Sequence, residues 1–78
     1  MLNPLIPLAR SIRARREAAG LSQEQLADQC GFDRTYISML ERGKRNPSFV
    51  NLLRLAKGLG ISVATLTEVY KNGFDADR

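Results

Sequence analysis

The chain contains no histidine, no tryptophan and a single cysteine, Cys30. Without histidine the commonest general base is missing, and neither paired carboxylates nor a glycine-rich phosphate loop is visible in its place. A lone cysteine cannot close an internal disulfide, and without histidine it cannot complete a zinc site. These absences argue against an enzyme, a metal site and any other cofactor.

Long apolar runs are also missing. No segment approaches the roughly 20 residues that are needed to cross a bilayer. The first residues carry no basic group ahead of their apolar stretch, which Pro4 and Pro7 interrupt, so we expect no secretory signal. We therefore expect a cytoplasmic protein with no membrane partner. The chain is also too short for a separate ligand-sensing domain, so no small-molecule ligand is expected.

What the chain does contain is enough for one small domain. Its 78 residues are 44% apolar and 26% charged, which suits a compact soluble protein with a modest core. Apolar residues recur at intervals of three or four, the period of amphipathic helices. Capping residues and glycines predict helices over about 7–19, between Ser22 and Gly31, between Asp33 and Gly43, between Ser48 and the pair Gly58 and Gly60, and from Ser62 through Tyr70. The prediction is an all-α, compact five-helix bundle over residues 1–70, followed by a polar tail over 71–78.

The second and third predicted helices meet at a corner made of small residues. Ala27 lies on the inner side of the second helix, and Gly31 falls where the chain turns. Two helices can cross steeply only where small residues let their backbones approach. Any corner between two helices would use such residues, so this pattern alone leaves DNA binding and plain packing equally open.

The outward face of the third helix favours DNA binding. Ile37 and Leu40 mark its inner side, and the opposite side carries the candidate base-reading residues Arg34, Thr35, Ser38 and Met39. Arginine can bond a guanine edge through two hydrogen bonds, hydroxyls can bond bases or phosphates, and a methionine can touch a thymine methyl group. The competing interpretation of Arg34 is a solvated surface charge.

Positive charge is concentrated around the same segment. The net charge of +4 is small, but residues 34–57 carry six basic side chains and one acid, Glu41. The start of the second helix offers free N–H groups to an anion. The candidate phosphate-binding residues are Ser22, Gln23, Tyr36, Arg42, Lys44, Arg45 and Asn46. A solvated basic loop is the alternative for Lys44, Arg45 and Asn46, and the ring of Tyr36 could pack at the rim of the core.

Four segments carry a resemblance to a known family: Gly-Leu-Ser-Gln-Glu-Gln-Leu-Ala at 20–27, Gly-Phe-Asp-Arg-Thr-Tyr-Ile-Ser at 31–38, Leu-Glu-Arg-Gly-Lys-Arg-Asn-Pro-Ser at 40–48 and Leu-Gly-Ile-Ser at 59–62. Over about residues 8–69 the chain resembles the helix-turn-helix family of lambdoid phage repressors and Xre-type bacterial regulators. Within that family it looks like the controller proteins of restriction–modification systems. The resemblance implies a bacterial or phage-encoded transcription regulator that binds a two-fold operator in double-stranded DNA as a homodimer. It also implies a structural salt bridge between Arg16 and Glu41.

A dimer needs an interface, here called the dimer seam, and the last part of the predicted bundle carries apolar side chains that could form it. The candidate interface residues are Leu53, Leu59, Val63, Leu66, Val69 and Tyr70, of which Leu59 and Leu66 are expected to be partly core. The rival function is a protein-interaction module, antitoxin-like or a scaffold, built on the same fold. RNA binding is disfavoured because few aromatic side chains are free for stacking, and Phe32, Phe49 and Phe74 look like core or tail residues.

Overall fold

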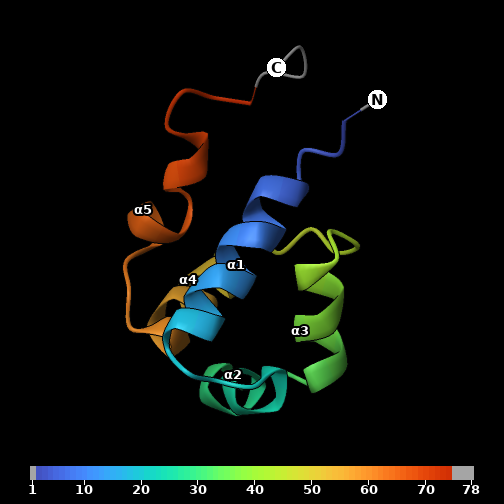
Figure 1. Ribbon diagram of the computed structural model, residues 1–78, viewed down its shortest axis with the longest axis vertical. Coiled ribbons are helices and arrows are strands. Elements are labelled where there is room, and N and C mark those ends of the chain that lie inside the picture. Colours follow the sequence, from blue (N-terminus) through green and yellow to red (C-terminus); the bar gives the residue numbers. More distant parts are fainter. Residues whose placement is uncertain (1, 75–78) are drawn as a thin grey trace.

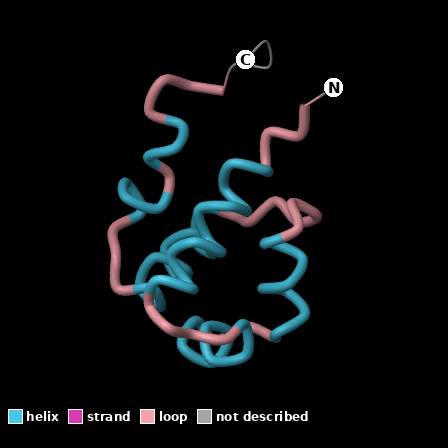
Figure 2. Tube along the Cα trace, viewed as in Figure 1, coloured by secondary structure: helices cyan, strands magenta, loops and turns pink. Residues whose placement is uncertain are grey.

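A computed structural model describes residues 2–74 of the chain. Within that range the chain forms α-helices and one short 3-10 helix, with no strand (Figures 1 and 2). The elements are α1 (Ile6–Ala18), α2 (Gln23–Cys30), α3 (Arg34–Glu41), α4 (Phe49–Leu59), α5 (Val63–Leu66) and the 3-10 helix η1 (Glu68–Tyr70). The predicted all-α, five-helix class is confirmed. The last part of the predicted polar tail, residues 75–78, lies outside the described residues.

Serine side chains begin three of the helices. The hydroxyls of Ser22, Ser48 and Ser62 each accept a hydrogen bond from the backbone N–H three residues later, at 3.0, 3.1 and 3.0 Å. At Ser22 the backbone N–H also donates to the side chain of Gln25, which completes a capping box. Gly31 ends α2 with φ at +74°, a conformation that side chains other than glycine's adopt only with strain.

The core takes one large side chain from each α-helix. Ile12, Leu26, Ile37, Leu55 and Leu66 come from α1 to α5 in order, and all are fully buried. Because every helix contributes to one cluster, the described residues form a single hydrophobic core. No helix in that part of the chain has both the length and the apolar content for crossing a membrane.

Gly58 does not break α4, contrary to the prediction. It lies inside the helix, and a Cβ atom on this residue would overlap the sulfur of Cys30 on α2. Glycine inside a helix is less favourable than alanine by about 1 kcal/mol, and here the missing side chain lets α2 and α4 approach. Gly60, with φ at +72°, is the residue that ends α4.

The predicted fifth helix is divided into α5 and η1. Thr67 stands between them with φ at −104°, and its hydroxyl donates a 2.7 Å hydrogen bond back to the carbonyl of Val63. A threonine that bonds its own preceding turn bends or ends a helix. The change of direction brings Tyr70 against the start of α1, where its hydroxyl accepts from the N–H of Leu8 at 3.0 Å and bonds the carbonyl of Pro4.

Candidate nucleic-acid interface

α3 stands at the margin of the molecule, and its outer side is uncovered in the view of Figure 1. Ile37 and Leu40 are buried on its inner side. The predicted base-reading residues all reach the surface: Arg34 and Thr35 are exposed, and Ser38 and Met39 are half-buried. For Arg34 and Thr35 the described part of the chain offers no hydrogen-bond partner to the side chain, so both remain free to meet a ligand.

The corner between α2 and α3 has the small residues that close crossing requires. Ala27 is buried at the base of the corner, and the backbone N–H of Phe32 donates to its carbonyl at 2.9 Å. Asp33 precedes α3 with an extended backbone, but its carboxylate makes no capping hydrogen bond. The expectation that Asp33 caps α3 through its side chain is therefore wrong.

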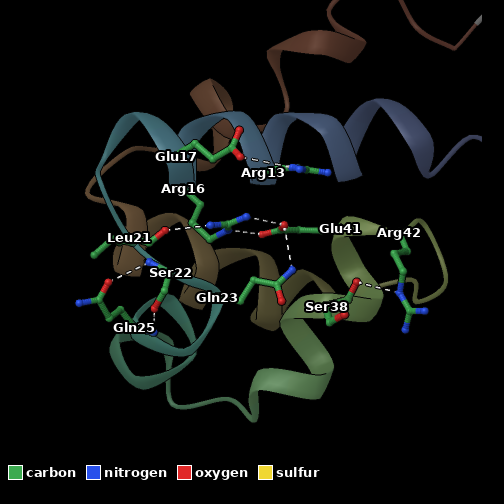
Figure 3. Close-up of polar contacts among 10 residues, drawn as sticks. All are labelled: Arg13, Arg16, Glu17, Leu21, Ser22, Gln23, Gln25, Ser38, Glu41 and Arg42. Carbon is green, nitrogen blue, oxygen red and sulfur yellow. Dashed lines mark hydrogen bonds and ion pairs between the residues drawn. The ribbon is translucent and has the colours of Figure 1, made fainter.

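A buried ion pair fixes the far end of α3. Arg16 on α1 donates from Nε to Oε2 of Glu41 at 2.6 Å and from the second guanidinium nitrogen to Oε1 at 2.9 Å (Figure 3). Its third nitrogen donates to the carbonyl of Leu21 at 2.8 Å. The two side chains are only 12% and 4% exposed. The hydrogen bond to Glu41 is the main reason why the pKa of Arg16 lies above its usual value.

The same carboxylate orients the first residue of α2. Nε2 of Gln23 donates to Oε1 of Glu41 at 3.2 Å (Figure 3). An amide nitrogen carries two hydrogens, so Gln23 keeps one donor for a phosphate. The hydroxyl of Ser22 accepts the capping bond from the N–H of Gln25, and its own hydrogen stays available to donate to a phosphate oxygen.

The basic loop after α3 is anchored by the N-terminal segment. Gly43 is buried with φ at +69°, and the side-chain amide of Asn3 donates to its carbonyl at 3.0 Å. The residues that follow Gly43 are exposed, and they are Lys44, Arg45 and Asn46. Arg42, also exposed, bends back to donate from Nε to the carbonyl of Ser38 at 3.4 Å (Figure 3). The anchor at Gly43 fixes where this positively charged loop lies beside α3.

A hollow of about 570 Å³ opens beside α3. Its lining combines predicted residues with others from the turn and from α4: Gly31, Phe32, Asp33, Thr35, Tyr36, Met39, Arg45, Asn51 and Arg54. The ring of Tyr36 packs on Phe32 with centroids 4.8 Å apart, and the guanidinium of Arg45 lies 5.4 Å from its centroid. The hydroxyl of Tyr36 accepts from the amide of Asn51 at 3.0 Å. Tyr36 is thus partly packed, as the alternative interpretation allowed.

Asn51 and Arg54 were not predicted as site residues. They lie three residues apart on α4, and Arg54 bonds the turn before α3 while Asn51 bonds Tyr36 on α3. Their i, i+3 spacing predicts that they share one face of a helix. The sequence alone does not indicate which face of that helix contacts α3.

The predicted dimer seam is only partly at the surface. Leu66 is 0% exposed because it fills the centre of the core, so its assignment to the interface is wrong. Leu53 and Val69 are exposed, whereas Leu59, Val63 and Tyr70 are half-buried. Among the described residues the two most exposed large apolar side chains stand at the start of α4, namely Phe49 at 66% and Val50 at 62%, and Leu53, one turn further along the helix, is 47% exposed. Phe49 was expected in the core or tail, and that expectation is wrong.

Known proteins share this architecture and much of its sequence. The chain matches the helix-turn-helix family over residues 12–66. Control protein C.MunI from Mycoplasma sp is 50% identical over 54 residues, which span 69% of this chain and 73% of the relative. The crystal structure of the restriction-modification controller protein C.AhdI from Aeromonas hydrophila superposes with a TM-score of 0.78 at 47% identity, covering 80% of this chain and 94% of that one.

A third similar protein was crystallised with DNA. The restriction-modification controller protein C.Esp1396I, solved as a tetramer in complex with its natural 35-base-pair operator, gives a TM-score of 0.77 at 37% identity and covers 86% of this chain and 90% of that one. The chain belongs to the helix-turn-helix family, as its motifs predicted. The named relatives are control proteins, which agrees with the prediction that the chain is not an enzyme.

Proposed function

We propose that this chain is a sequence-specific DNA-binding transcription regulator, of the restriction–modification controller kind, with α3 in the major groove of its operator. The observation that carries the proposal is the free outer face of α3. Arg34 and Thr35 stand exposed at the N-terminal end of that helix, which is the end that meets base edges in helix-turn-helix proteins. The controller assignment rests on the relatives named above and on the complex of one of them with its operator.

The surroundings of α3 divide the proposed contacts into two classes. Arg34, Thr35, Ser38 and Met39 read bases, because they share the outer face of the helix. The flanking set of Ser22, Gln23, Tyr36, Arg42, Lys44, Arg45 and Asn46 contacts phosphates. Its arginines and lysine lie in the segment that directly follows α3 and supply the sequence-independent attraction.

The operator has two-fold symmetry and is bound by a homodimer. One helix of eight residues offers few base contacts, and a second copy doubles them with half-sites about 34 Å apart. We propose the seam at Leu53 with Phe49 and Val50 beside it, since these three form an exposed apolar patch at one end of α4. Residues 1–70 then hold both the DNA-binding and the dimerising surfaces, with 71–78 as a polar tail. Such a regulator works in the cytoplasm, where the genome lies.

Selection of bound oligonucleotides from a random pool tests the proposal. An enriched sequence with two inverted half-sites is expected, and Arg34→Ala should weaken binding to it by about 1–3 kcal/mol while relaxing selectivity at one position of each half-site. Arg13→Ala, on the exposed side of α1, is the matched control. A pool that shows no enrichment would instead favour the protein-interaction module.

Leu53→Glu tests the seam separately. Sedimentation should show the wild type as a dimer and the variant as a monomer, because a charge in an apolar seam loses its hydration without a partner. A variant that stays dimeric would place the seam elsewhere.

A further inference from the structure

The turn between α2 and α3 is held from outside by one side chain of α4. Arg54 donates from Nε to the carbonyl of Cys30 at 3.2 Å and from a terminal nitrogen to the carbonyl of Gly31 at 2.7 Å. Its guanidinium carbon also lies 4.1 Å from the ring centroid of Phe32. One arginine therefore contacts three consecutive residues, the last residue of α2 and the first two of the turn. We call this set, Arg54 with residues 30–32, the turn clamp.

The chemistry of the turn explains why an arginine suits it. The last carbonyls of a helix lack partners within the helix and form the negative end of its dipole. A guanidinium is planar, permanently charged and carries five donors, so it can bond two carbonyls while its flat face covers an aromatic ring. A lysine carries the same charge on a single nitrogen and cannot reproduce this geometry.

The clamp continues into the first turns of α3. Arg54 also donates to Oδ1 of Asn51 at 3.4 Å, and the amide of Asn51 donates to the hydroxyl of Tyr36 at 3.0 Å. The ring of Tyr36 in turn packs on Phe32. A closed set of contacts thus joins α4, the turn and α3, so that the start of α3 cannot shift without breaking one of them.

We propose that Arg54 is a positioning residue for DNA recognition: it holds the turn so that α3 presents Arg34 and Thr35 at a fixed angle, and it does not itself contact DNA. The inference rests on the proposed function of α3. Three of the five guanidinium N–H groups are already bonded, to the carbonyls of Cys30 and Gly31 and to Asn51. A binding constellation must be held within about 0.5 Å of its productive geometry, and α3 begins only two residues after Phe32.

The test is Arg54→Lys, which keeps the charge and removes the fork. In the free protein, amide hydrogen exchange at Phe32 should become faster, because its N–H bonds the carbonyl of Ala27 across the turn that the clamp closes. Binding to the selected operator should weaken by roughly tenfold, the scale of one lost charge-assisted hydrogen bond. Affinity for a random duplex and the salt dependence should stay at wild-type values. Arg13→Lys on α1 is the control, and it should change none of these quantities.

Three results would overturn the proposal. Unchanged exchange together with unchanged operator affinity in Arg54→Lys would mean that the clamp positions nothing. Equal weakening on both duplexes, with a salt slope lower by about one in Arg54→Ala, would make Arg54 a phosphate contact. Unchanged exchange at Phe32 in Arg54→Lys, together with a wild type that binds every duplex with equal affinity, would remove both the clamp and the proposed function.

Two further results separate the inference from the function on which it rests. A wild type without sequence preference but with faster exchange in Arg54→Lys would retain the clamp and remove its role in DNA reading. If Arg54→Lys does not fold, Asn51→Ala breaks the link to Tyr36 and should weaken operator binding but not random binding. Equal affinities of Asn51→Ala and wild type for the operator would then refute the positioning role.

Discussion

Removing Arg16 should destabilise the fold severely, because its partner is buried. Arg16→Ala leaves Glu41, whose side chain is 4% exposed, with only the amide of Gln23 as a hydrogen-bond donor from another side chain. Breaking a buried pair in this way costs about 3–5 kcal/mol. A chain of 78 residues has a total stability of roughly 4–12 kcal/mol at 0.05–0.15 kcal/mol per residue. The variant therefore loses a large fraction of its stability.

The assay is thermal and urea unfolding of Arg16→Ala, Glu41→Leu and the double variant Arg16→Met with Glu41→Leu. With roughly 4–8 °C per kcal/mol for a domain of this size, the single Arg16 variant should melt at least about 12 °C lower. The double variant should recover most of the loss, because it leaves no unpaired buried charge. A melting point of Arg16→Ala within about 3 °C of wild type would refute the reasoning.

The pH dependence of the pair follows from the sign of the shift. The pKa of Arg16 is raised in the folded state, chiefly by its hydrogen bond to Glu41. A raised pKa of a cation stabilises the fold fully below the unfolded-state pKa, and the contribution is lost only as the pH rises through the folded-state value. For an arginine that window lies in strong alkali. We therefore expect that deprotonation of Arg16 does not change the difference in unfolding free energy between the wild type and the double variant Arg16→Met with Glu41→Leu at neutral or mildly alkaline pH. Unfolding measured over this pH range checks the expectation.

The remaining predictions concern the interface and the helix crossings. Arg45→Ala should weaken binding to operator and random DNA alike and lower the salt slope by about one; an unchanged slope would remove Arg45 from the phosphate contacts. Ala27→Leu should overpack the corner between α2 and α3 and cost about 1–3 kcal/mol, so a wild-type melting temperature would contradict the close crossing. Gly58→Ala should lower stability although alanine favours helices, because its Cβ meets the sulfur of Cys30, and Cys30→Ala should restore it. A more stable single variant would show that α2 and α4 can separate freely.

The local signals in the sequence predicted the helices well. Ser22, Ser48 and Ser62 cap the helices they were expected to cap, since a serine hydroxyl acts on N–H groups only two or three residues away. The alternation of buried Ile37 and Leu40 with exposed Arg34 on α3 also followed from helical period alone. In both cases the interaction that decides the outcome lies within a few residues along the chain.

The errors arose where a distant part of the chain decides. From the sequence alone, Gly58 is predicted to end its helix. Only the folded structure shows that Cys30 packs against it from α2. Leu66 and Phe49 are both large and apolar, yet one fills the centre of the core and the other stands exposed. The helical period predicts which face of its helix each of these two residues occupies. It does not predict which face packs against another helix. Arg54 is one of the six basic residues counted within 34–57, and its role in holding the turn was not predicted for the same reason, because Cys30 and Gly31 lie far from it in sequence.

Arg16 and Arg54 both hold α3 in position, one at each end of the helix. Arg16 ties the C-terminal end of α3 to α1 through Glu41, and Arg54 ties the turn before its N-terminal end to α4. α3 has only eight residues and buries two of them in the core, and the contacts at its two ends add to the restraint that this packing provides. Contacts at both ends constrain its tilt much more than an equal number at one end. The base reading that we propose for the exposed Arg34 then depends on charged side chains that lie outside α3. Combining Arg16→Lys with Arg54→Lys should reduce operator discrimination by more than the product of the two single effects.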